Sequence, residues 1–494
     1  MREMCYITEC MLSLSEKTRI SHVSARKKQL KKHRILVRII SLGCPKNFVD
    51  TEQAAADLLI HGGGLTDSEE EADVLFINTC AFLQSAREEA ETQIRSALLW
   101  KQEKKGRLVV VSGCLVNWDK TGAFRNGLPE VDAWLPTHET STLGAVIQSL
   151  HSPESVRCIG HAASPDPARL PLTPSHYAWL RIADGCDNRC TYCLIPSIRG
   201  GLRSRPEKAI LEEAGNLVGS GVRELLVIAQ DTSAYGRDLS RDGTPRLAKL
   251  LRKLDKLPQG DDYLIRLLYL HPASVTDELL DVMEKMRHLV RCVEMPIQHV
   301  SGPVLKRMNR HIDEAGLRRV VSNLKERGFA VRTTFMTGFP GETEEDFRKL
   351  AAFAEEVRFE RFGVFSWSEE PGTAAAAMKK KVPEEERERR RGILMAIQKK
   401  NSRALNRKWL GKICEVIVDE VIPGRREAVG RTLLDIPEID NSVTITGLPA
   451  DRIRRGKIVP GDRIRIRVDR AGIYGITGSW TEEKQQTSET TEKA

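Results

Sequence analysis

The chain has 494 residues, of which 40% are hydrophobic and 29% are charged, and its formal net charge is +9. This length predicts about two to four domains, and the composition excludes a disordered chain because it supplies enough apolar residues for folded cores. No stretch reaches the roughly 20 consecutive apolar residues of a membrane-spanning helix, and the N-terminus lacks the pattern of a signal peptide. We therefore expect a cytoplasmic protein with no membrane contact.

The chain contains 11 cysteines. In a reducing compartment clustered thiols bind metal more often than they form disulfides, so we expect thiolate ligands. The modest positive charge is compatible with RNA or a ribonucleoprotein as a partner, without requiring one.

Residues 1–34 end in the basic run SARKKQLKKHR. We predict a flexible basic extension there, and both an arm on RNA and a solvated tail fit it. Over residues 35–150 the apolar strands RILVRIISLGC, ADVLFINTC and RLVVVSGCL alternate with helical stretches, which predicts a small parallel α/β domain. Residues 151–172 are rich in Pro, Ser and Ala, which is typical of a linker.

Each of these three strands leads directly into a cysteine, namely Cys44, Cys80 or Cys114. The carboxyl ends of parallel strands lie along one edge of a sheet, where ligands bind, so we expect the three thiols to converge. Buried structural cysteines are the alternative interpretation.

Residues 173–405 contain a longer series of six strand and helix units, beginning at YAWLRIADGC and ending at RFGVFSWS. This series predicts a partial (β/α)6 barrel with its functional groups at the carboxyl ends of the strands. Residues 406–480 change character, because ICEVIVDEVI, EAVGRTLL, NSVTITG and DRIRIRVDRAG are short and rich in β-branched residues. They predict a small antiparallel β-barrel, and the polar residues 481–494 predict a disordered tail.

The most specific local pattern is the loop GCDNRCTYCLIPSIRGG, in which Cys186, Cys190 and Cys193 have C-x3-C-x2-C spacing after a strand. A four-iron cluster takes four ligands, so three thiolates leave one iron open to a substrate or cofactor. A structural zinc site would close with a fourth Cys or His, which this loop does not supply. Zinc and thiols without a metal are the alternatives to an iron-sulfur cluster.

The spacing and its neighbours resemble the radical S-adenosylmethionine family. The resemblance implies that Cys186, Cys190 and Cys193 ligate a 4Fe-4S cluster whose open iron binds S-adenosylmethionine, and that electron transfer to this cofactor yields a 5′-deoxyadenosyl radical. The cofactor then supplies the difficult bond cleavage, and the barrel positions and shields the radical.

Together with SLGCPKNFVDTE, FINTCAF and VVSGCL, the chain resembles the methylthiotransferases within that family, from about Ile35 to Tyr474. The resemblance implies a second 4Fe-4S cluster on Cys44, Cys80 and Cys114 that binds or donates the sulfur. It also implies that the C-terminal barrel is a TRAM domain, and that turnover needs an external electron donor and a sulfur source. The other cysteines are expected to be partly buried thiols.

Two stretches distinguish the branches of the family. Cys44-Pro45-Lys46-Asn47 and the run IPSIRG at 195–200 resemble the branch that methylthiolates the β-carbon of an aspartate in ribosomal protein S-twelve. We interpret Asp435, Glu438 and Asp440 as carboxylates that favour a protein partner over RNA. The neighbouring DRIRRGKIVPGDRIRIRVDR could equally meet RNA phosphates.

Two alternatives remain open from the sequence. One is a tRNA adenosine methylthiotransferase, to which the positive charge and the TRAM-like barrel point. The other is a non-catalytic iron-sulfur protein that docks on ribosomes or senses their state.

Overall fold

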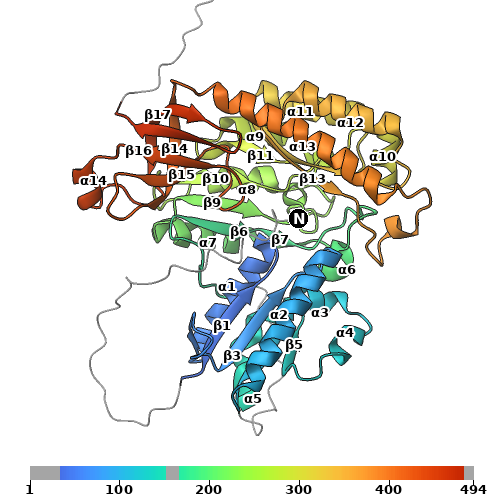
Figure 1. Ribbon diagram of the computed structural model, residues 1–494, viewed down its shortest axis with the longest axis vertical. Coiled ribbons are helices and arrows are strands. Elements are labelled where there is room, and N and C mark those ends of the chain that lie inside the picture. The colour runs from blue at the N-terminus through green and yellow to red at the C-terminus, as the bar shows by residue number, and fades with distance from the viewer. Residues whose placement is uncertain (1–33, 152–165, 483–494) are drawn as a thin grey trace, which may run out of the picture. The chain divides into compact units, whose positions relative to one another are not determined.

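The structure is a computed structural model that describes residues 34–151 and 166–482. The chain forms two compact units (Figure 1). The first contains the residues up to Leu172 together with Leu194–Gly200, and the second contains Thr173–Cys193 and the residues from Gly201 onward. The basic extension, the middle of the linker and nearly all of the C-terminal tail lie outside the described residues, as do Cys5, Cys10 and Cys158. The predicted domain boundaries stay predictions.

The first unit contains a parallel sheet with strand order β2-β1-β3-β4-β5. Its strands are β1 (Leu36–Ser41), β2 (Gly64–Leu65), β3 (Val74–Thr79), β4 (Leu108–Gly113) and β5 (Ala133–Leu135). Its helices are α1 (Pro45–Ile60), α2 (Gln84–Gln102), α3 (Cys114–Trp118), α4 (Ala123–Asn126), α5 (Leu143–His151) and α6 (Ile195–Arg199).

This sheet is buried on both faces, as its nearly continuous apolar strands require. Along β3, Phe76 packs with residues of α1 and α5, and the next residue, Ile77, packs with residues of α2. Leu194 and Ile198, which follow the C-x3-C-x2-C loop, join the core on the α2 side. The expected parallel α/β domain is therefore confirmed.

The second unit contains six parallel strands in the order β13-β12-β11-β10-β9-β6. They are β6 (Tyr177–Arg181), β9 (Glu224–Ile228), β10 (Leu264–Leu267), β11 (Leu289–Glu294), β12 (Ala330–Thr337) and β13 (Arg361–Ser366). The main helices of this unit are α7 (Glu207–Gly219), α8 (Leu247–Leu254), α9 (Asp277–Lys285), α11 (Glu314–Glu326), α12 (Glu344–Val357) and α13 (Glu384–Arg407). Two short strands, β7 (Ala183–Asp184) and β8 (Arg203–Ser204), form a hairpin, and α10 spans Gly302–Arg307.

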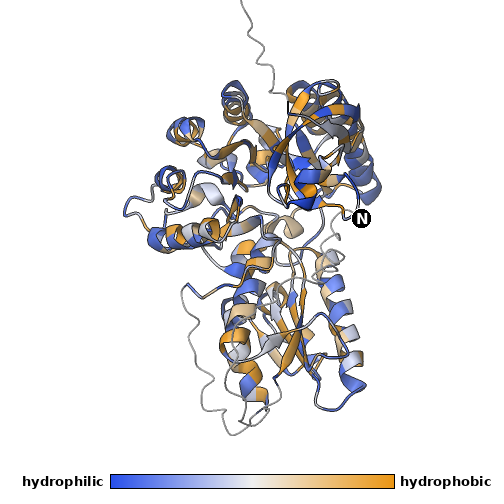
Figure 2. Ribbon diagram, turned by 90° about the vertical axis from the view of Figure 1, so that its left-hand side faces the viewer, coloured by the Kyte–Doolittle hydropathy of each residue, from blue (hydrophilic) through white to orange (hydrophobic). Residues whose placement is uncertain are grey.

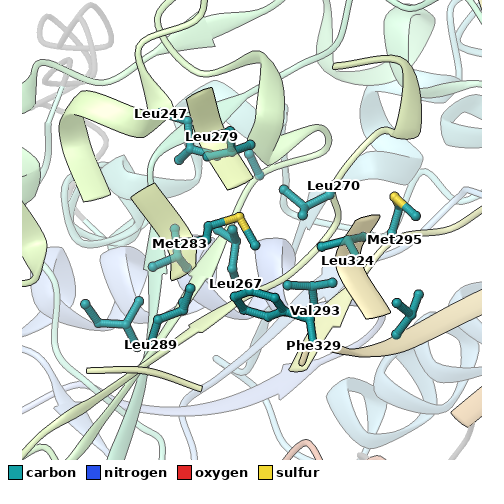
Figure 3. Packing of buried hydrophobic residues seen from close by; sticks show 14 of the residues in the cluster. Leu247, Leu267, Leu270, Leu279, Met283, Leu289, Val293, Met295, Leu324 and Phe329 are labelled. Carbon is teal, nitrogen blue, oxygen red and sulfur yellow. The ribbon is translucent and has the colours of Figure 1, made fainter. Parts of the chain in front are cut away.

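Amphipathic helices cover this second sheet. Figure 2 shows apolar residues concentrated on the strands and polar residues on the outer sides of the helices. In Figure 3, Leu267 of β10 and Val293 of β11 lie among side chains of the covering helices, such as Met283 and Leu324. Burial of these side chains removes apolar surface from water, which is the main favourable contribution to folding of this unit. The expected partial (β/α)6 barrel is confirmed.

The C-terminal residues form a closed five-stranded barrel with the order β14-β15-β16-β18-β17. Its elements are β14 (Ile413–Val421), β15 (Ala428–Thr432), β16 (Ser442–Thr446), α14 (Ala450–Arg454), β17 (Arg463–Ala471) and β18 (Gly475–Trp480). The expected small barrel is confirmed, but it is not wholly antiparallel because β16 and β18 pair in parallel. A closed ring with an odd number of strands must contain at least one such pair.

Buried ion pairs hold this C-terminal barrel to the six-stranded sheet. Asp435 accepts a 2.9 Å hydrogen bond from Nε of Arg361, and Asp440 accepts one of 2.9 Å from Arg332. Glu438 accepts a 2.5 Å hydrogen bond from the hydroxyl of Tyr177. Asp435 and Asp440 are therefore held by contacts within the second unit, so these two carboxylates do not bear on the choice between a protein and an RNA partner, whereas Glu438 is exposed.

In the part of the chain that the structure describes, no helix is both long enough and apolar enough to cross a membrane.

Candidate metal centres

The first candidate centre lies where β1, β3 and β4 end. Cys44 precedes α1, Cys80 follows β3, and Cys114 begins α3. A side chain on Gly43 would place its Cβ 3.3 Å from Sγ of Cys80, so the backbone before Cys44 lies close to Cys80. The structure thus brings together the three thiols that the sequence placed at one sheet edge.

Asn47 links this group of thiols. Its Oδ1 lies 3.4 Å from Sγ of Cys114 and 4.0 Å from Sγ of Cys44. Its Nδ2 donates to the carbonyl oxygens of Thr79 at 2.8 Å and Leu42 at 3.3 Å, where two of the strands end. The fully buried amide therefore fixes the strand ends from which the cysteines project.

Burial dominates the acidity of these thiols. Burial, with smaller contributions from the neighbouring Cys114 and Cys44, raises the pKa of Cys80 to about 12. Burial also raises the pKa of Cys114 to about 11, although the guanidinium of Arg199 acts in the opposite direction. Three bare thiolates would repel one another here, whereas a bound metal would neutralise them and release their protons.

The second candidate centre is the loop between β7 and α6 that carries Cys186, Cys190 and Cys193. The amide of Cys193 donates to the carbonyl of Cys190 at 3.0 Å, which forms a tight turn between two of the thiols. Burial raises the pKa of Cys186 to about 11. The left-handed backbone of Gly185, at φ +74°, begins the loop, and such a conformation suits glycine.

Neighbouring elements hold this loop in place. Nδ2 of Asn309 donates to the carbonyl of Arg189 at 3.0 Å, and Oγ1 of Thr191 donates to the carbonyl of Arg307 at 2.8 Å. Nδ2 of Asn188 donates to Oδ2 of Asp231 at 2.6 Å, just beyond β9. The loop is thus fixed at the carboxyl ends of the barrel strands, as the fold predicts.

Two further polar side chains lie near this loop. Arg310 is buried, and its Nη1 lies 3.6 Å from Sγ of Cys190 and 3.4 Å from the hydroxyl of Tyr192. His271 is also buried, beyond the end of β10. Burial lowers the pKa of His271 to about 2, and the nearby charge of Arg310 adds to that effect, so the imidazole is neutral at physiological pH. Within the described residues, its Nε2 has no hydrogen-bond partner.

Each donor set consists of three cysteine thiols, which is the ligand type of iron-sulfur clusters. Among the described residues, no group of three or more Cys, His, Asp and Glu side chains stands where it could hold one metal ion. A zinc ion gathers its sulfurs at about 2.3 Å from one centre, whereas a four-iron cluster binds each thiolate on a different iron. The assignment of the six cysteines as cluster ligands stays a prediction.

Three family models match separate parts of the chain. Residues 36–136 match an uncharacterised protein family, UPF0004, residues 180–354 match the radical SAM superfamily, and residues 410–481 match the TRAM domain. Their order agrees with the three folded parts expected from the sequence.

Curated relatives match nearly the whole chain. The ribosomal protein uS12 methylthiotransferase RimO of Geobacter sulfurreducens is 39% identical over 454 residues, which cover 90% of this chain and 98% of that protein. The protein of the same name from Heliobacterium modesticaldum is 39% identical over 460 residues, which cover 90% of this chain and 95% of the relative. The chain belongs to the RimO family of methylthiotransferases.

A solved structure supports the fold of this RimO family member. The radical S-adenosylmethionine methyltransferase TsrM of Kitasatospora setae, solved with cobalamin and a 4Fe-4S cluster bound, matches with a TM-score of 0.53 at 12% identity. The match covers 69% of this chain and 77% of that one. At this identity the likeness concerns the fold alone.

Sequence reasoning missed the polar residues around the thiols. Arg199 and Asn47 lie in the two branch-specific stretches, but these patterns predict no contact between them or with a thiol. Arg310 and His271 belong to no pattern that predicts a site. A local signal exists for Asn47, Arg199 and His271, which lie close to a predicted cysteine or strand end. None exists for Arg310, whose contact with Cys190 joins distant segments.

Proposed function

We propose that this chain is a radical S-adenosylmethionine enzyme that methylthiolates the β-carbon of an aspartate in ribosomal protein S-twelve, free or within the small ribosomal subunit. The observation that carries the proposal is that two sets of three cysteines follow strand ends. The chain that holds them is 39% identical to a uS12 methylthiotransferase, and the match covers 98% of that relative. The reaction would take place in the cytosol and would draw electrons and sulfur from external donors.

The two centres have separate tasks in this proposal. Cys186, Cys190 and Cys193 would hold one 4Fe-4S cluster and leave an iron for S-adenosylmethionine, and Cys44, Cys80 and Cys114 would hold the other. When bound, these groups would supply the one-electron chemistry that removes a hydrogen atom from an unactivated C–H bond and the sulfur that replaces it.

The described residues support these tasks by positioning. Asn309 and Asp231 fix the loop that carries Cys186, Cys190 and Cys193, so the three thiols would hold a cluster in a fixed position. The neutral His271, beyond the end of β10, would offer Nε2 as a hydrogen-bonding group without adding a charge there. The exposed Arg467 and Arg470 of β17, in the part that matches the TRAM domain, are suited to contact with ribosomal RNA.

The test is a reconstitution with iron and sulfide, followed by incubation with ribosomal protein S-twelve, S-adenosylmethionine, reductant and sulfide under anaerobic conditions. Mass spectrometry should find one methylthio group on an aspartate. Cys80→Ala should abolish this product but keep the formation of 5′-deoxyadenosine, and Cys190→Ala should abolish both. Cys292→Ala is the matched control, because this buried thiol lies outside both sets.

Two results would contradict the proposal. Methylthiolation of tRNA in the same assay, with none on the ribosomal protein, would identify the tRNA branch. Failure to form 5′-deoxyadenosine, despite a full complement of iron, would favour a non-catalytic iron-sulfur protein.

A further inference from the structure

A buried arginine reaches the thiols of the first unit from a distant part of the sequence. Arg199 ends α6 and is 3% exposed. Its Nη2 donates to Oδ1 of Asn47 and to Oδ2 of Asp50, each at 2.6 Å. Leu194 and Ile198 anchor the same short segment in the apolar core beside α3. Arg199 therefore belongs to the group around the first candidate centre, although it follows the cysteine loop of the second.

The contacts of Arg199 place its positive charge next to the thiol of Cys114. Oδ1 of Asn47 accepts from Arg199 at 2.6 Å and lies 3.4 Å from Sγ of Cys114, so the guanidinium and the thiol meet at one atom. Asp50, the second partner of Arg199, is 3% exposed and lies one turn of α1 after Asn47. Desolvating an ion pair is expensive, and an apolar pair of similar volume could fill the same space at lower cost. The position of the pair thus calls for a role beyond packing.

We propose that Arg199 is a positioning residue that raises the reduction potential of the cluster held by Cys44, Cys80 and Cys114, and that the negative charge of Asp50 opposes this effect. This inference rests on the proposed function. Net charge and hydrogen bonds near the sulfurs govern the potential of an iron-sulfur cluster. Reduction adds one negative charge to the cluster, so the guanidinium favours the reduced form and the Asp50 carboxylate opposes it.

The opposite signs of the two charges make the proposal testable. Loss of the Arg199 charge should make the cluster harder to reduce, and loss of the Asp50 charge should make it easier. A residue that only anchors α6 would not give shifts of opposite sign. Measuring both variants therefore distinguishes an electrostatic role of Arg199 from a purely structural one.

The experiment uses the full chain with Cys186→Ala, Cys190→Ala and Cys193→Ala, so that one cluster site remains. This triple variant is the parent for the further substitutions. Each variant is reconstituted with iron and sulfide, assayed for iron, and titrated with reductant while the reduced cluster is followed by electron paramagnetic resonance. Arg199→Met should lower the ratio of reduced to oxidised cluster at a fixed potential by about tenfold, which is about 59 mV for one electron. Asp50→Asn should raise this ratio, and Arg199→Lys should restore most of the parent value.

Arg107→Met is the matched control. Arg107 is also a buried arginine of the first unit in an ion pair, with Glu103 at 3.0 Å, but it precedes β4 at the opposite end of the strand from Cys114. The cluster potential should not change in this variant.

Each other outcome is decisive. A parent protein that binds no iron would overturn both the proposed second cluster and this role for Arg199. A cluster whose potential is unchanged in Arg199→Met, or that moves in the same direction in Asp50→Asn, would overturn the role of Arg199 alone. If Arg199→Met cannot retain iron, the Asp50→Asn shift decides: a higher potential supports the proposal, and an equal or lower one rejects it.

Discussion

Glu224, at the start of β9, lies between two arginines. Its carboxylate accepts a 2.8 Å hydrogen bond from Nε of Arg266 in β10 and a 2.6 Å hydrogen bond from Nη2 of Arg431 in β15. Burial raises the pKa of Glu224, but the two guanidinium groups outweigh it, so the pKa lies below the ordinary value of 4.5. One carboxylate thus compensates cations from both barrels of the second unit.

Glu224→Gln should lower the stability of the second unit at pH 7 by about 3–5 kcal/mol, because two buried guanidinium groups lose their charged partner. A carboxylate with a lowered pKa stabilises the fold above its unfolded pKa and loses that contribution as the pH falls through the folded value. The difference in melting midpoint between the variant and the parent should therefore shrink below about pH 4.5, as measured by calorimetry from pH 7 to pH 3. Glu103→Gln, at an exposed carboxylate, should show neither effect.

The turn between β4 and α3 shows how an element boundary places a thiol. Gly113 has φ +102° immediately before Cys114. A Cβ there would lie 2.4 Å from Oδ1 of Asn78 and 2.5 Å from the carbonyl oxygen of Thr79. Glycine is therefore required both by the backbone conformation and by the neighbouring strand.

Gly113→Ala should displace Cys114 and reduce the iron bound after reconstitution from about eight to about four atoms per chain, because one of two four-iron sites would be lost. Gly106→Ala is the control, since Gly106 has a similar φ of +93° but no atom within 4 Å of the added Cβ. It should bind as much iron as the parent. Equal iron in both variants would mean that the turn does not support a cluster.

The long elements could be predicted from sequence, because each is a run of apolar residues bounded by polar or glycine-containing turns. The strands β1, β3 and β4, which lead into Cys44, Cys80 and Cys114, are examples. The strand β18 was missed because GITGSW is short and contains two glycines. The place of α6 could not be predicted, since its residues follow the cysteine loop in sequence and pack in the first unit through long-range contacts.

On the scale of the whole molecule, buried and exposed ion pairs join the two barrels of the second unit. Asp440 lies close to Arg332, which also approaches Glu294 at 3.3 Å. Asp262 makes a similar connection at the surface, with Arg463 of β17 at 3.2 Å. These contacts show that Asp440 carries no information about the partner, because nothing in a local sequence pattern separates an internal carboxylate from an exposed one.

Asp440→Asn should lower the melting midpoint of the second unit by about 5 °C or more, because it removes one partner of a buried ion pair. It should also speed the release of the C-terminal barrel by trypsin. Asp262→Asn, whose carboxylate is 65% exposed, should change the midpoint by about 1 °C or less. Similar effects of the two variants would contradict the view that the buried ion pair of Asp440 holds the C-terminal barrel more strongly than the exposed pair of Asp262 does.

The discontinuity of the first unit has a consequence for dissecting the protein. A fragment that stops at Leu172 would omit Leu194–Gly200. It would expose the apolar surface that Leu194 and Ile198 cover and leave Asp50 without its arginine. An exchange of the cysteine loop with a relative raises the same difficulty, because the transplanted residues must match Asn47 and Asp50 of the host. The natural unit of exchange in this protein is therefore a pair of segments, one from each side of the linker.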